Sequence, residues 1–372
     1  MINLTKILLS GYYGFNNAGD EAILCSIIDG LKQTIPNVDL VVLSGNPEET
    51  RKLYNVRALS RVNYTRLMFE LNKADLLISG GGSLLQDATG SLTIPYYLSI
   101  IKMAKLMKVP IMFFSQGVGP VNSKMLANMI KRTLTGVNSI TVRDQQSADL
   151  LHEIGLSNVR LTADPVFFLQ PVAKQRVKEI LIEEHIPFNE NGPWIGVSVR
   201  PWQGQEHYVK EIAKALDEII KKYNAQIIFL PFEHSRDYEV VLQVSNLMNE
   251  YSHVYILQNQ YRADELLGIC QQLDVMIGMR LHSLIFAARQ GVNIIGISYD
   301  PKIDAFLERL AKTAIGTTKD LKASKIVENL GKILNDVEGN KQQVIEKATQ
   351  LQQEAWQAIQ IATSLALGDC ND

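Results

Sequence analysis

The stretch GMRLHSLIFAARQGVNIIGISYD, residues 278–300, has the pattern that decides the predicted fold. A short apolar segment ends at a turn, an apolar helical segment follows, and a β-branched segment at residues 293–297 comes next. Strand, helix and strand in this order are typical of a parallel βαβ unit. Arg280 and His282 lie at the turn before the helix, where α/β proteins usually bind ligands. A cation and an imidazole there favour an anionic ligand and proton transfer.

The same alternation extends in both directions along the chain. It predicts strands at residues 6–10, 39–43, 75–79, 110–115 and 139–143, and again at 194–201, 226–231, 253–257, 274–278 and 293–297. We therefore predict an α/β protein of GT-B-like architecture, with two doubly wound, Rossmann-like parallel-sheet domains that face a cleft. The predicted parts are a first domain at 1–170, a linker at 171–192, a second domain at 193–340, and a C-terminal helix and tail at 341–372.

Composition limits the possible functions. A chain of 372 residues is too long for one ordinary core, and its net charge of −2 argues against a nucleic-acid partner. Cys25, Cys270 and Cys370 form no CxxC pair, so we expect a reducing, cytoplasmic location and neither a zinc site nor a disulfide framework. The N-terminal segment is too short for a signal peptide, and no apolar run reaches the ~20 residues of a spanning helix.

Glycine-rich loops follow three predicted strands of the first domain: SGYYGFNNAGDEAIL (10–24), ISGGGSLLQDATG (78–90) and SQGVGP (115–120). Their glycines leave backbone N–H groups open to a ligand, although a purely structural turn is the alternative for residues 80–82. The spacing is not G-x-G-x-x-G, so no dinucleotide site is predicted. Asp20 and Glu21 open the next helix, where they would also complement its dipole.

Cations follow several strands of the second domain. Arg200, Arg280 and Lys302 each come after a different predicted strand, and LPFEHSRD (230–237) adds Arg236 after another. Arginine forks and helix N-termini match phosphate and carboxylate groups, so this domain is predicted to bind a small polyanion. In the first domain, Arg143 ends a strand and either pairs with Asp144 or binds ligand.

Seven segments of the chain together resemble the polysaccharide pyruvyl transferase family. They are GYYGFNNAGDEAIL, ISGGGSLLQD, SQGVGP, TVRDQQSADLL, DPVF, GVSVRPW and MRLHSLIFAARQGVNIIGISYDPK. Within the family, the chain is most similar to the bacterial branch that adds a pyruvyl ketal to a cell-wall polysaccharide precursor. That resemblance implies phosphoenolpyruvate as donor, release of phosphate, and no cofactor or metal. It also implies an N-acetylmannosamine acceptor in a lipid-diphosphate-linked disaccharide, whose polymer anchors surface-layer proteins.

The resemblance also implies roles for individual residues. The family's Arg-Leu-His signature corresponds to Arg280, Leu281 and His282, and its donor-site arginine corresponds to Arg200. Arg143 and Lys302 are implicated in donor binding in the same way. His282 would act as general acid with Arg280 beside it, and Asp20 would orient or deprotonate a sugar hydroxyl. The acceptor side would be lined by the first two glycine-rich loops, through Gly11, Tyr12, Gly14, Asn17, Gly80, Gly81 and Gly82.

Three other hypotheses remain open from the sequence. A GT-B nucleotide-sugar glycosyltransferase of cell-wall polysaccharide synthesis would share the fold, but Phe286 and Ala287 occupy the region where such enzymes often carry a ribose-binding glutamate. A non-catalytic two-lobed binding protein would not need a histidine beside the arginines. The basic, apolar segment 94–110 could make peripheral contact with the inner leaflet of the cytoplasmic membrane, or it could simply pack on the sheet.

Overall fold

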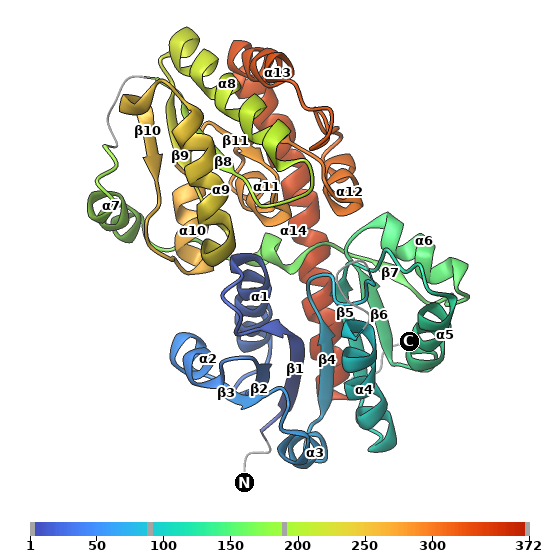
Figure 1. Ribbon diagram of the computed structural model, residues 1–372. Coiled ribbons are helices and arrows are strands. Elements are labelled where there is room, and N and C mark those ends of the chain that lie inside the picture. Colours follow the sequence, from blue (N-terminus) through green and yellow to red (C-terminus); the bar gives the residue numbers. More distant parts are fainter. Residues whose placement is uncertain (1–3, 88–91, 188–191, 369–372) are drawn as a thin grey trace. The chain divides into compact units, whose positions relative to one another are not determined.

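The computed structural model describes residues 4–87, 92–187 and 192–368, which form two compact α/β units (Figure 1). The first unit comprises Met1–Leu169 and Leu351–Asp372, and the second comprises Gln170–Gln350. The segment predicted as a linker contains helix α7 (Lys174–Glu183), which belongs to the second unit. The final helix, α14 (Val337–Leu367), is divided between the two units.

The first unit is built on a seven-stranded parallel sheet with strand order β3-β2-β1-β4-β5-β6-β7. Its strands are β1 (Lys6–Tyr13), β2 (Asp39–Ser44), β3 (Arg57–Ser60), β4 (Leu76–Gly80), β5 (Ile111–Gln116), β6 (Ser139–Val142) and β7 (Arg160–Leu161). Its helices before α14 are α1 (Ala18–Thr34), α2 (Pro47–Tyr54), α3 (Tyr64–Leu71), α4 (Thr93–Leu106), α5 (Lys124–Leu134), α6 (Gln145–Glu153) and the 3₁₀ helix η1 (Pro165–Phe168).

Burial on both faces explains why the inner strands are continuous apolar runs. Ile7, Leu8 and Leu9 of β1 are all fully buried, because right-handed crossovers place α1 and α2 on one face of the sheet and α3 to α6 on the other. The sequence prediction omitted the two edge strands. β3 and β7 are only four and two residues long, and they include exposed arginines, Arg57 and Arg160, in place of an apolar run.

The second unit has a five-stranded parallel sheet with strand order β10-β9-β8-β11-β12. Its strands are β8 (Trp194–Ser198), β9 (Gln226–Phe229), β10 (Val254–Ile256), β11 (Val275–Gly278) and β12 (Asn293–Gly296). Its helices besides α7 are α8 (Gln205–Tyr223), α9 (His234–Leu247), η2 (Tyr251–His253), α10 (Ala263–Cys270), α11 (Leu281–Arg289), α12 (Pro301–Arg309) and α13 (Ala323–Asn335). The predicted fold class, two parallel-sheet α/β domains with a helical C-terminal region, is confirmed.

The C-terminal half of α14 packs on the first unit, far from its neighbours in sequence. Ile359 is buried against Gly30 of α1, where a Cβ would lie only 2.8 Å from the Ile359 Cδ1 atom. The hydroxyl groups of Thr34 and Thr363 are 2.7 Å apart, and the ring of Trp356 stacks on Phe168 at 4.9 Å. The last helix is therefore an integral part of the first unit's core.

Replacing Ile359 with alanine should test this packing. We expect Ile359→Ala to lower the free energy of unfolding by ~2–5 kcal/mol. Removing the side chain leaves a cavity against Gly30, and α1 already lies too close to α14 to move in and fill it. Urea denaturation followed by circular dichroism measures the change, with the exposed Gln357→Ala as the matched control. Equal stability of the two variants would contradict the packing.

Candidate functional site

Three loops of the first unit contact one another at the carboxyl ends of β1, β4 and β5. The Tyr13 hydroxyl donates a hydrogen bond to the Gly80 carbonyl at 2.6 Å. The N–H of Gly117 donates to the Gly82 carbonyl at 2.8 Å. The three glycine-rich loops that stood apart in the sequence therefore form one surface.

Close approach of α1 explains the glycines at positions 81 and 82. Both have positive φ values, +79° and +80°, which favour glycine. A Cβ on Gly82 would lie 2.7 Å from an Asp20 carboxylate oxygen, and one on Gly81 would lie 2.0 Å from the Ile23 side chain. The structure thus brings the predicted residues Asp20, Gly81 and Gly82 together.

The Glu21 side chain holds the loop that begins at Gly14. The Glu21 carboxylate accepts hydrogen bonds from the Gly14 N–H and the Tyr54 hydroxyl, both at 2.7 Å. Burial raises the pKa of Glu21, and these hydrogen bonds oppose the rise. The predicted acceptor residue Asn17 caps α1, with its side-chain oxygen accepting from the Gly19 N–H at 3.0 Å.

Arg143 lies in the first unit, whereas the other predicted donor residues lie in the second. Its guanidinium donates to Asp164 and to the Ser83 hydroxyl, each at 2.8 Å, while the Asp144 carboxylate is 3.7 Å away. Asp164 is thus the closer carboxylate, and Arg143 links the β6 end to the second glycine-rich loop.

In the second unit, Arg280 at the end of β11 is paired with two carboxylates. Its Nε and Nη2 atoms donate to Asp237, with Nε at 3.0 Å, and Nη2 also donates to Glu233 at 2.8 Å. The Asp237 side chain is 0% exposed. Burial raises the pKa of the Asp237 carboxyl, and the charge of Arg280 opposes that rise. Within the described part of the chain, the Arg280 Nη1 atom makes no hydrogen bond.

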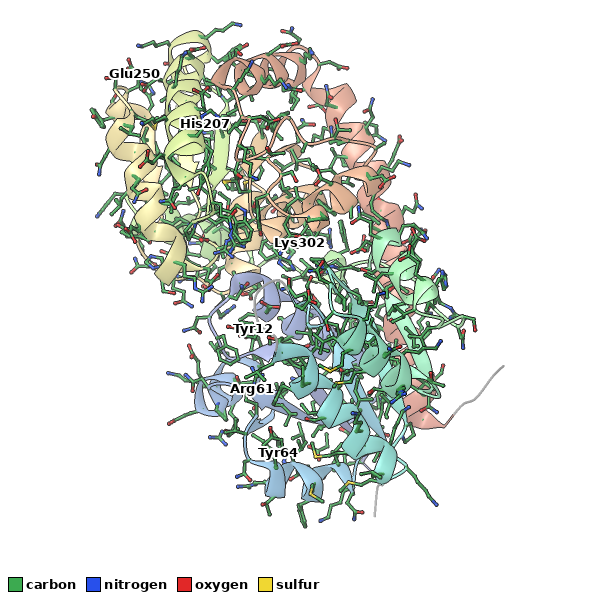
Figure 2. The ribbon with its side chains drawn as sticks, turned by 45° about the vertical axis from the view of Figure 1, so that its right-hand side comes forward. Tyr12, Arg61, Tyr64, His207, Glu250 and Lys302 are labelled. Carbon is green, nitrogen blue, oxygen red and sulfur yellow. The ribbon has the colours of Figure 1, made fainter. Side chains whose placement is uncertain are left out.

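Arg200 and Lys302 both lie near the ring of Tyr299. The Arg200 guanidinium donates to the Tyr299 hydroxyl at 2.7 Å and lies 4.7 Å from the centre of its ring. The Lys302 ammonium lies 5.5 Å from the centre of the same ring and 3.3 Å from Asp300. Lys302 is labelled in Figure 2. The Arg200 Nε atom is buried and has no hydrogen-bond partner among the described residues. A donor group buried in this way favours an additional acceptor from a ligand.

His282 is the second residue of α11 and is half-buried. It follows Arg280, which is the N-cap residue of the same helix. Because β8, β11 and β12 are neighbours in the sheet, Arg200, Arg280, His282 and Lys302 all follow the carboxyl ends of adjacent strands. These four side chains are suited to holding a small polyanion and donating a proton to it.

The sequence analysis missed Asp237, the buried carboxylate partner of Arg280. Asp237 was not singled out because an acid in the first turn of a helix usually complements the dipole. Its position four residues after Glu233 was the available signal, since both side chains then lie on one face of the helix. Tyr299 was also missed, although ISYDPKI (297–303) places it just before the predicted Lys302.

Removing Arg280 should destabilise the second unit. We expect Arg280→Leu to lower the free energy of unfolding by ~3–5 kcal/mol, because Asp237 would remain buried without its cation. The exposed Arg236, which also pairs with Glu233, provides the control Arg236→Leu, for which no measurable change is expected. Chemical denaturation measures both. The double variant Arg280→Leu with Asp237→Leu should regain part of the loss, and no recovery would argue against the pairing as its cause.

Comparison with known proteins identifies the family and the fold. Among solved structures, a putative UDP-N-acetylglucosamine 2-epimerase from Listeria monocytogenes is similar with a TM-score of 0.69 at 9% identity, over 99% of this chain and 98% of that one. The UDP-GlcNAc 2-epimerase from Neisseria meningitidis, bound to UDP-GlcNAc, has a TM-score of 0.65 at 13% identity, over 97% and 99%. At this identity the likeness shows a shared GT-B-like fold. A sequence model for polysaccharide pyruvyl transferase matches residues 17–301, so the chain belongs to the polysaccharide pyruvyl transferase family.

Proposed function

We propose that this transferase moves the pyruvyl group of phosphoenolpyruvate onto an N-acetylmannosamine residue of a lipid-diphosphate-linked cell-wall precursor. The product is a 4,6-ketal, and inorganic phosphate is released. The observation that carries the donor assignment is the arrangement of Arg200 and Lys302 around Tyr299 beside the Arg280–His282 turn. Family membership supports the transfer of a pyruvyl group.

Phosphoenolpyruvate carries a phosphate and a carboxylate, and the second unit offers cations for both. Arg200 has a buried Nε donor to satisfy, and Lys302 supplies a second positive charge. Arg280 is already largely neutralised by Asp237 and Glu233, so its part is a directed hydrogen bond from Nη1 rather than net charge. Such fixed donors stabilise the charge that develops on the departing phosphate.

The reaction moves two protons. Two C–O bonds to the sugar form, while the C–O bond to phosphate and the C=C π bond of phosphoenolpyruvate break. The first sugar hydroxyl adds to C2 of phosphoenolpyruvate while the methylene carbon takes up a proton and becomes a methyl group. The neighbouring hydroxyl then replaces phosphate at C2, and the phosphate leaves with the second proton. His282 is our general acid, because an imidazole titrates near neutral pH.

We assign the acceptor to the loops of the first unit. Asp20 faces the Gly82 backbone and would accept a proton from a sugar hydroxyl or orient it. Tyr12, which stacks on Phe15 at 4.2 Å, and the backbone of Gly11, Gly14 and Gly80 would line the same surface. We place the reaction at the cytoplasmic face of the membrane, where a lipid-linked precursor is available, and its ketalised polymer would anchor surface-layer proteins.

A direct assay tests this function. The purified protein is incubated with phosphoenolpyruvate and a synthetic lipid-diphosphate disaccharide ending in N-acetylmannosamine, and phosphate release and product mass are measured. We expect phosphate release with a pyruvyl mass gain, reduced at least ~100-fold in His282→Gln because general acid catalysis contributes about that much. The exposed His152→Gln is the control and should retain activity.

The nucleotide-sugar hypothesis has its own discriminating measurement. The solved structures that share the fold include an enzyme bound to UDP-GlcNAc, so this compound is the natural competitor. Thermal unfolding is recorded with phosphoenolpyruvate and with UDP-GlcNAc. Protection by phosphoenolpyruvate supports the proposal, and protection by the nucleotide sugar alone would replace it with the glycosyltransferase.

A further inference from the structure

A cluster of aromatic rings in the first unit surrounds Arg61, a residue that has no part in the proposed reaction as described above. Arg61 directly follows β3, and its guanidinium lies 4.2 Å from the ring centre of Tyr96, 5.2 Å from that of Phe15 and 5.6 Å from that of Tyr97. These residues come from the loops after β1 and β3 and from the start of α4, so they gather at the carboxyl ends of the strands. In the view of Figure 2, Arg61 lies between Tyr12 and Tyr64.

The backbone of Arg61 is fixed on both sides. Its N–H donates to the Ser44 carbonyl at 3.1 Å, and its carbonyl accepts from the Tyr96 hydroxyl at 3.0 Å. Its side chain is half-buried against the rings. The guanidinium is thus held in place before any ligand binds, and preorganised donors bind at lower entropic cost.

Arg61 has no carboxylate within ion-pair distance in the described part of the chain. Arg57, Arg143 and Arg280, by contrast, all pair with acids. A half-buried guanidinium on aromatic rings keeps its positive charge and its forked donors, which match phosphate oxygens. The site therefore has the charge and geometry to take up an anion.

The same cluster connects Arg61 to the residue that we assign to the sugar hydroxyl. The Tyr97 hydroxyl is buried without a hydrogen bond of normal geometry in the described residues. Burial raises the pKa of Tyr97; the positive charge of Arg61 opposes this rise and the negative charge of Asp20 adds to it. The charges of Asp20, in the first turn of α1, and of Arg61, after β3, thus act on the Tyr97 phenol in opposite directions.

We propose that Arg61 binds the diphosphate of the acceptor while Asp20 meets its sugar hydroxyl. This inference rests on the proposed function in one respect, namely that the acceptor carries a diphosphate. The other source of a phosphoryl anion is the donor phosphoenolpyruvate, and the experiment separates the two. The aromatic rings hold Arg61 in position, so that it selects for acceptors that carry the charged group.

The decisive comparison is between acceptors with and without diphosphate. In Arg61→Gln, we expect KM for an undecyl-diphosphate-linked disaccharide to rise at least tenfold, with KM for phosphoenolpyruvate unchanged. The same disaccharide without diphosphate should be used equally well by the wild type and the variant. Arg132→Gln, at an exposed arginine on α5, is the matched control and should behave as the wild type. Arg61→Lys keeps the charge and should recover part of the affinity.

Titration calorimetry of the undecyl-diphosphate disaccharide without donor separates this inference from the proposed function. Loss of binding in Arg61→Gln, but not in Arg132→Gln, supports the site even if no pyruvyl transfer is detected. Equal binding by the wild type and a folded Arg61→Gln overturns it. A weaker affinity for phosphoenolpyruvate alone would also overturn it, because the phosphoryl group would then be the donor's.

A separate observation concerns α3, which exposes apolar side chains next to this cluster in sequence. Tyr64, Met68 and Phe69 are between 46% and 58% exposed, and Val62 before the helix is 67% exposed. The sequence analysis offered contact with lipid as one alternative for the segment that forms α4. Most apolar residues of this helix are buried, including Ile94, Leu98 and Ile101. Among the described residues, every helix is too short or too polar to cross a bilayer.

The charges around α3 complement an anionic surface. Arg66 is exposed, and the Lys73 ammonium lies 4.0 Å from the ring centre of Phe69. Glu70, the one acid between residues 61 and 73, is buried and faces inward to Lys6 at 3.1 Å and Arg57 at 2.5 Å. The outer face of α3 thus combines apolar side chains with cations and presents no acid.

We infer that α3 rests on an anionic lipid surface, with Tyr64, Met68 and Phe69 entering the headgroup region. Such contacts combine apolar burial with attraction to anionic lipid. Co-sedimentation with vesicles of phosphatidylcholine and about 30% phosphatidylglycerol, which imitate an anionic membrane, tests the inference. We expect binding that falls at least fivefold in Met68→Ser with Phe69→Ser, and that weakens in high salt.

Leu106→Ser with Met125→Ser is the matched control, because these side chains are more exposed than Met68 and Phe69 but belong to α4 and α5. It should bind as the wild type. Absence of wild-type binding, or equal loss in both double variants, overturns the assignment to α3.

Discussion

A fully buried carboxylate in the second unit, Asp237, determines how the cations of the proposed donor site are arranged. Asp237 cannot remain ionised without a partner inside the protein, and Arg280 supplies it through two nitrogen atoms. The pairing connects the start of α9 to the turn between β11 and α11, across the β8 end where Arg200 lies. His282 follows Arg280 by two residues, so its place depends on the same contact. Arg280, which looks like a substrate-binding residue in the sequence, therefore stabilises the fold of the second unit through Asp237.

The two units offer different chemistry at their strand ends. The second gathers cations that would hold the anionic donor of the proposed reaction. The first places one carboxylate, Asp20, against a glycine backbone and one arginine among aromatic rings. In the proposed acceptor, Asp20 would serve the sugar hydroxyl and Arg61 would serve the attached diphosphate. The proposed reaction thus divides between a unit that stabilises negative charge on a leaving group and a unit that prepares a neutral nucleophile.

The fold could be predicted from the sequence because its strongest signal is local. Continuous apolar segments such as Ile7–Leu9 are typical of strands buried on both faces, and the cations that follow them can be read directly from the sequence. The partners of those cations were not. Arg280 meets Asp237, 43 residues earlier, and Arg143 meets Asp164 rather than the adjacent Asp144. The choice of partner depends on which strands are neighbours in the sheet, and no local pattern encodes this.

The division of α14 has a consequence for the order in which the chain folds. Residues from 351 onward complete a unit whose other residues, up to 169, leave the ribosome first. Until Ile359 covers Gly30, one side of α1 lies open to water. The second unit, whose segments are contiguous, can form during synthesis while the first waits for its final helix. Contacts over such separations slow folding, so the part of the molecule that is made first is the last to mature.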